Sequence, residues 1–173
     1  MSDTSETDPF QLEELENSEQ EFLVKLPYRV GMYISQSDTS GGDLSDEKEL
    51  QALEIIVTTY AQDFCKSEFV QQVMNKTVLY KDKWPQWSGK IEKVPEECAA
   101  MREILEEKLI LKDMAAFKHN LYEIGQSVAL AYRESNRDLR GVKLFIKKMG
   151  YRFYKKKCHK TSQEPLQWEE FLN

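Results

Sequence analysis

Apolar residues recur at every third or fourth position over most of this chain, and that spacing constrains the fold more than any other feature. It places the apolar side chains on one face of an α-helix, whereas a half-buried strand needs strict alternation of apolar and polar residues. No segment alternates in that way over any length. Seven glycines and five prolines leave few tight turns, which disfavours a sandwich or barrel of many short strands. The sequence therefore predicts an all-α fold, a compact bundle of about six to seven helices.

Helix starts are indicated by residues that cap or open helices. We expect helices to begin near Ser18, near Ser45 or Asp46, at about Lys66, at Pro95, after Asp113 as the N-cap, and near Asp138. Pro27 lies within the first apolar pattern, so that helix either begins after it or bends there. Trp84, Pro85 and Trp87 form an aromatic connector. Pro85 rules out an uninterrupted helix, and the two indoles should hold the connector against the core.

The length of 173 residues suits one domain with tails. Residues 1–19 are acidic and rich in Ser and Thr, so we expect a disordered tail there, in which Phe10 to Leu15 could form a loose helical turn. A single helical domain should span residues 20–157, followed by a C-terminal tail over residues 158–173. Three distant cysteines without CxxC spacing, and the lack of a signal peptide, predict reduced thiols in the cytoplasm. No apolar run approaches the roughly 18 to 20 residues that cross a bilayer.

Two short segments repeat. Residues 28–31 read YRVG and residues 122–125 read YEIG. Each lies in an amphipathic segment that leads into a charged loop and then into another amphipathic segment. The order of helix, charged loop and helix thus occurs twice, which predicts two related helical hairpins.

The loop of the first hairpin, residues 38–49, is rich in acids, and oxygen ligands of this kind suit hard divalent cations. The distance from Asp38 to Glu49 equals an EF-hand loop, but Gly42 and Asp43 stand where an acid and a glycine are needed, so we exclude an EF-hand. A carboxylate site of another kind, formed by Asp38, Asp43, Asp46 and Glu49, stays open. So does a metal-free corner, in which Ser45 or Asp46 caps the helix and the other acids favour its dipole.

Catalytic machinery is not indicated. The sequence contains no GxSxG, no P-loop and no glycine-rich dinucleotide turn. His119 and Glu123 are four residues apart on one helix face, opposite the apolar stripe around Phe117 and Leu121, so we expect a solvated surface pair. We therefore predict no catalytic residue and no enzymatic activity.

Basic residues concentrate near the C-terminus, whereas acids dominate the first two dozen residues. The segment KLFIKKMGYRFYKKKCHK, residues 143–160, interleaves bases with aromatic residues, a pattern that suits an acidic protein partner, a nucleic acid or an anionic membrane surface. The overall pI near 5.1 disfavours nucleic acid. We expect a protein partner, and peripheral membrane contact stays open. The candidate partner-binding residues are Lys147, Lys148, Arg152, Lys155, Lys156 and Lys157.

A family resemblance rests on the two loops. GGDLSDEKE, residues 41–49, is similar to the DGEISxEE stretch of TerB-like (tellurite-resistance) domains. ALAYRESNRDLRGVKLFIKKMG, residues 129–150, resembles the closing stretch of that family. The resemblance covers roughly residues 24–150 and identifies the chain as a divergent member. It implies a compact domain of two related helical hairpins, a divalent metal held by loop carboxylates, and a setting in stress response or tellurite resistance.

The resemblance also implies a ligand set. Asp43 matches the Glu of the family's DGE, and the acids that open the next helix fall on Glu47 and Glu49. The family's first Asp falls on Gly41, which leaves Asp38 to supply that carboxylate across a short insertion. In the second copy, acidic character is kept at Glu134 and Asp138. The implied cation is Ca²⁺, Mg²⁺ or Zn²⁺.

These features together predict a non-catalytic helical binding or scaffold domain that holds a divalent cation in an acidic loop between helices. The alternative is a metal-free protein-interaction module that uses the basic C-terminal segment. A nucleic-acid-binding helical domain is a third and less favoured interpretation.

Overall fold

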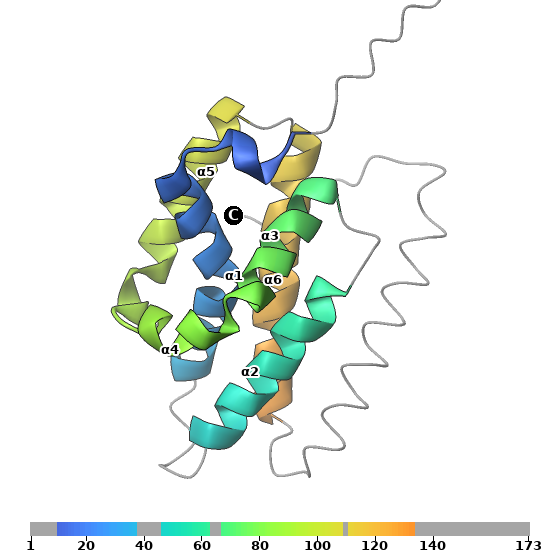
Figure 1. The fold of residues 1–173 in the computed structure, drawn as a ribbon. Helices are drawn as coiled ribbons and strands as arrows, with labels where there is room; N and C mark the ends of the chain where they lie inside the picture. Colours follow the sequence, from blue (N-terminus) through green and yellow to red (C-terminus); the bar gives the residue numbers. More distant parts are fainter. Residues whose placement is uncertain (1–9, 38–45, 63–66, 109–110, 134–173) are drawn as a thin grey trace, which may run out of the picture.

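The computed structural model describes residues 10–37, 46–62, 67–108 and 111–133, and every regular element within them is helical (Figure 1). The helices are α1 (Asn17–Ser37), α2 (Asp46–Ala61), α3 (Glu68–Leu79), α4 (Trp84–Trp87), α5 (Val94–Lys108) and α6 (Leu111–Arg133). Three 3-10 turns accompany them: η1 (Leu12–Glu14) precedes α1, and η2 (Lys81–Lys83) and η3 (Ile91–Lys93) lie between α3 and α5. The prediction of an all-α bundle is confirmed. The helix expected near Asp138 lies outside the described residues.

Helix α1 occupies the centre of the bundle and packs against α2, α3, α4, α5 and α6. It runs parallel to α6 and antiparallel to α2 (Figure 1). Burying each Leu, Ile or Phe side chain of the core contributes about 1.5–3 kcal/mol. The largest fully buried side chains include Leu23, Leu26, Leu53, Ile56, Phe69, Met74, Leu105, Phe117 and Ile124.

Pro27 lies inside α1, so the helix does not begin after it as one interpretation of the sequence allowed. A proline within a helix removes one backbone hydrogen bond and costs about 3 kcal/mol. Here buried side chains stand on both sides of the proline, with Leu23 and Leu26 before it and Tyr28 after it. Their packing keeps the helix continuous through Pro27.

The predicted disorder is wrong for residues 10–19, whereas the alternative of a helical turn between Phe10 and Leu15 agrees with η1. Leu12 and Leu15 are buried, and the ring of Phe10 lies 6.0 Å from that of Phe69 in α3. The backbone N–H of Leu12 donates to Oε1 of Gln72 at 2.7 Å. Three apolar side chains in a short acidic stretch thus cover the N-terminal half of α3, which offsets the entropy of ordering it. Residues 1–9 lie outside the described part.

Two helix starts differ from the prediction. Helix α6 begins at Leu111, so Asp113 lies in its first turn instead of capping it, where its carboxylate still favours the positive end of the helix. Helix α3 begins at Glu68, because the Ser67 hydroxyl accepts the Val70 N–H at 3.2 Å as an N-cap. In the described residues we find no helix with the length and apolarity that a membrane span requires.

Candidate functional site

Three described helix ends that adjoin the predicted cation-binding stretches in the sequence lie at one end of the bundle, which we call the acidic end. Helix α1 finishes there at Ser37, α2 begins there at Asp46 and α6 finishes there at Arg133, at the bottom of Figure 1. The chain between α1 and α2 and the chain after α6 therefore leave the bundle from the same end. These are the two stretches that carry the predicted carboxylates.

The structure describes little of those carboxylates themselves. Glu47 is exposed in the first turn of α2, and Glu49 follows in the same helix. Asp38, Asp43, Glu134 and Asp138 lie outside the described residues. Within the described ranges, no group of three or more His, Cys, Asp or Glu side chains is arranged to hold a metal ion. The candidate partner-binding residues, Lys147, Lys148, Arg152, Lys155, Lys156 and Lys157, also lie outside.

The two repeated segments lie in helices that pack together, but their residues have different roles. A Cβ added to Gly125 of α6 would meet Cγ1 of Ile34 in α1 at 3.4 Å, an ordinary contact. A Cβ on Gly31 of α1 would meet Cδ1 of Leu53 at 2.1 Å, so α2 approaches α1 closely at that glycine. Tyr28 is buried, whereas Tyr122 is 59% exposed. The repeat keeps a glycine at each helix crossing and changes the surroundings of the tyrosine.

The prediction that His119 and Glu123 form a solvated surface pair is wrong. His119 Nε2 lies 2.9 Å from Glu123 Oε1, and the side chain of Glu123 is only 4% exposed. Helices α2 and α3 cover this side of α6, as two hydrogen bonds show. The hydroxyl of Tyr60 in α2 lies 2.8 Å from that of Ser127, and the Asn120 amide donates to Sδ of Met74 in α3 at 3.2 Å. Asn120 and Ser127 stand one turn before and after Glu123. That row of short polar side chains was the signal that the helix buries a second, polar stripe.

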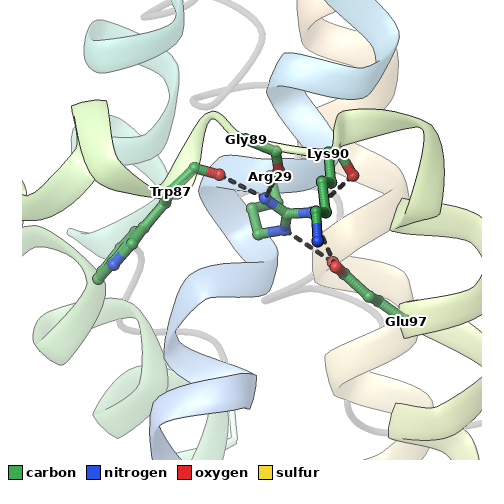
Figure 2. A network of polar contacts seen from close by, with 5 residues as sticks. All are labelled: Arg29, Trp87, Gly89, Lys90 and Glu97. Atoms are coloured by element: carbon green, nitrogen blue, oxygen red, sulfur yellow. Dashed lines mark hydrogen bonds and ion pairs between the residues drawn. The ribbon is translucent and has the colours of Figure 1, made fainter.

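A buried arginine, which sequence reasoning did not single out, joins three parts of the chain (Figure 2). Arg29 of α1 is 7% exposed and binds the Glu97 carboxylate of α5 through both Nε and an Nη atom, each at 2.7 Å. Its remaining N–H groups donate to the carbonyls of Trp87, of Gly89 at 2.8 Å and of Lys90 at 3.2 Å. The planar guanidinium matches this set of acceptors, which a lysine could not satisfy.

The same interactions fix the connector between α3 and α5, residues 80–93. Its two indoles are buried as predicted, and Trp84 stacks on Tyr28 with ring centroids 4.8 Å apart. Trp84 Nε1 donates to the Thr77 carbonyl at 2.9 Å. The connector contains one short helix, α4, with Pro85 in its first turn. Lys90 has a left-handed φ of 52°, and the hydrogen bonds from Arg29 to the Gly89 and Lys90 carbonyls hold this conformation in place.

Cys98 of α5 is half-buried, and burial raises the pKa of its thiol, with the charge of Glu97 adding to the effect. A raised pKa keeps the sulfur protonated and poorly nucleophilic.

No protein-family model, curated protein or solved structure matches this chain. The resemblance to TerB-like domains therefore stays a prediction that rests on the two loop sequences.

Proposed function

We propose that this protein is a non-catalytic helical binding module that holds a divalent cation at its acidic end. The observation that carries the proposal is the meeting of Ser37, Asp46 and Arg133 at one end of the bundle, from which both acidic stretches depart. Under this proposal Glu134 and Asp138, which follow α6 in the sequence, join Asp38, Asp43, Glu47 and Glu49 in one ligand set. Several carboxylates around one point are what Ca²⁺ and Mg²⁺ require.

Helix dipoles support a cation at this end. The C-termini of α1 and α6 both point there, and each carries the partial negative charge of a helix C-terminus. Among the described helices, α2 alone presents its positive N-terminus there, and acids occupy its first turn. The partial charges of these three described helix ends therefore sum to a negative value, which favours a cation.

Thermal unfolding with and without Ca²⁺, Mg²⁺, Mn²⁺ and Zn²⁺, each against a chelator, tests the proposal. A cation at about 100 times its Kd should stabilise the protein by about 2.7 kcal/mol and raise Tm by roughly 5–10 °C. Asp43→Asn should abolish this rise, and Glu47→Gln should reduce it. The control Glu103→Gln changes an exposed carboxylate on α5 and should leave the rise intact. If no cation shifts Tm, the cation site is refuted, and the metal-free interaction module through the basic segment becomes the better explanation.

The proposal also includes a biological setting. A cytoplasmic role in stress response or tellurite resistance rests on the loop resemblance alone, by analogy of family.

A further inference from the structure

We propose that the outward face of α6 is a contact between two copies of this chain, related by a two-fold axis beside Tyr122. The residues of this face recur every third or fourth position along the helix, away from the buried Phe117, Ile124 and Val128. They are Leu111, Ala115, Lys118, Tyr122, Gln126 and Ala129. Leu111 is 77% exposed and Tyr122 is 59% exposed, which makes them two of the most exposed large apolar side chains among the described residues.

The described helices leave this face uncovered. Helix α6 packs against α1, α2, α3 and α5, and these contacts bury the residues on its other sides. A surface helix ordinarily turns charged and polar residues toward water. The outward face of α6 instead carries apolar residues at four of its six positions: Leu111, Ala115, Tyr122 and Ala129. Exposed apolar surface with an aromatic residue near its centre is typical of a protein interface.

The outward face is symmetric about Tyr122. Ala115 stands seven residues before it and Ala129 seven residues after it, while Lys118 and Gln126 stand four before and four after. Two such helices that pair antiparallel about Tyr122 therefore set each alanine against the other alanine and each lysine against the glutamine. A two-fold contact uses the same patch on both copies, so it requires a self-complementary order of this kind. The small alanines allow the helix axes to approach to about 8–10 Å, where the two Tyr122 rings pack in an offset arrangement.

Charge favours the antiparallel direction. The N-terminal half of the outward face is basic, with Lys112 beside it and Lys118 within it, whereas residues 119–131 contain no lysine or arginine. An antiparallel pair places each basic half beside the C-terminal half of the other α6, where the helix dipole is negative. A parallel pair would place Lys118 against Lys118 of the second copy. The occupant that fits this face is therefore a second copy in the antiparallel direction.

The contact is small. Stable dimers bury about 1,200–2,000 Å² of surface in total, and contact along a single helix lies below that range. We therefore expect reversible association with a Kd on the order of 10–100 µM.

Analytical ultracentrifugation of the full chain over about 5–500 µM tests the association. The average mass should rise with concentration from the 20.3 kDa of one chain toward that of two. Tyr122→Glu places two carboxylates at the axis and should raise Kd at least about tenfold. The control Tyr80→Glu makes the same substitution at an exposed tyrosine at the end of α3 and should dimerise like wild type.

Disulfide cross-linking locates the axis, in a background in which the three native cysteines are serine. Tyr122→Cys should form a disulfide between two copies, because a residue on the axis faces itself within the roughly 7 Å that a disulfide spans. The control Gln126→Cys lies about 12 Å from its own copy along the helix and should stay reduced. Chains with Ala115→Cys, mixed with chains with Ala129→Cys, should form a mixed disulfide that neither forms alone.

Several outcomes would overturn the proposal: a monomer at every concentration, equal dimerisation of Tyr122→Glu and wild type, or equal cross-linking of Gln126→Cys and Tyr122→Cys. A monomer in which Tyr122→Glu lowers Tm would reject the second copy in favour of another part of the same chain. A monomer whose Tm does not change would reject it in favour of a different protein. Circular dichroism checks that each variant is folded. If Tyr122→Glu does not fold, the cross-linking pattern decides alone.

Discussion

At the scale of single residues, Arg29 shows what the sequence alone does not reveal. It stands between apolar neighbours in YRVG, and nothing local indicates its partners, which are a carboxylate and three carbonyls some sixty residues away. Glu123 gives the same lesson, because its burial depends on α2 and α3 covering α6. The partners of Arg29 and the burial of Glu123 both come from tertiary structure, so the pattern of these residues along the chain resembles that of exposed residues.

Replacing Arg29 by Lys should lower the free energy of unfolding by about 3 kcal/mol. The ammonium keeps the charge but cannot bind Glu97 in a bidentate manner and also reach the connector carbonyls, so buried acceptors lose their donors. Urea denaturation measures the loss. Arg102→Lys, in an exposed pair with Glu106 on α5, should change stability by less than about 0.5 kcal/mol. Equal effects of the two substitutions would show that the buried network adds nothing to stability.

At the scale of helices, apolar periodicity predicted the existence and type of the long elements, because each of them buries one stripe in a common core. The periodicity did not predict the exact first residues of the helices, and it did not predict the structure of the N-terminal stretch. Phe10, Leu12 and Leu15 are too few for a helix pattern, and acids surround them, so composition indicated disorder where the structure has a docked turn. The burial of Trp84 and Trp87 in the connector was predicted correctly, since exposing two large apolar indoles to water is unfavourable.

The two repeat glycines provide a matched pair of substitutions. Gly31→Ala should lower stability by about 1–3 kcal/mol, because its new methyl overlaps Leu53, which is fully buried and has little room to move. Gly125→Ala meets only ordinary contacts and should be neutral or stabilise by up to about 1 kcal/mol, since alanine favours helix over glycine. Chemical denaturation of both variants compares them directly. Equal stabilities would contradict the close approach of α1 and α2 at Gly31.

At the scale of the whole molecule, the boundaries of the folded unit can be tested by truncation. Deleting residues 1–9 removes none of the described core and should leave Tm unchanged within error. Deleting residues 1–16 also removes Phe10, Leu12 and Leu15 and should destabilise the protein by at least about 3 kcal/mol. Thermal and urea unfolding of the two truncated chains give the comparison. A small effect of the longer deletion would restore residue 20 as the domain boundary.

The candidate cation site was only partly predictable from the chain. The acids of residues 38–49 are visible as a charged loop, and the loop resemblance selects among them. What the sequence could not supply is the parallel direction of α1 and α6, which directs both acidic stretches to one end. The relative direction of two helices nearly a hundred residues apart depends on every connection between them, including the connector that Arg29 fixes.

The central position of α1 also has a consequence for synthesis. Helix α1, the first of the described α-helices to be synthesised, packs against α6, the last one described, and against each described α-helix between them. Translation at about 5–20 residues per second separates the completion of α1 from that of α6 by roughly 5–20 s. During that interval Leu23 and Leu26 lack part of the surface that finally covers them. The described core around α1 can therefore be completed only after residue 133 has emerged.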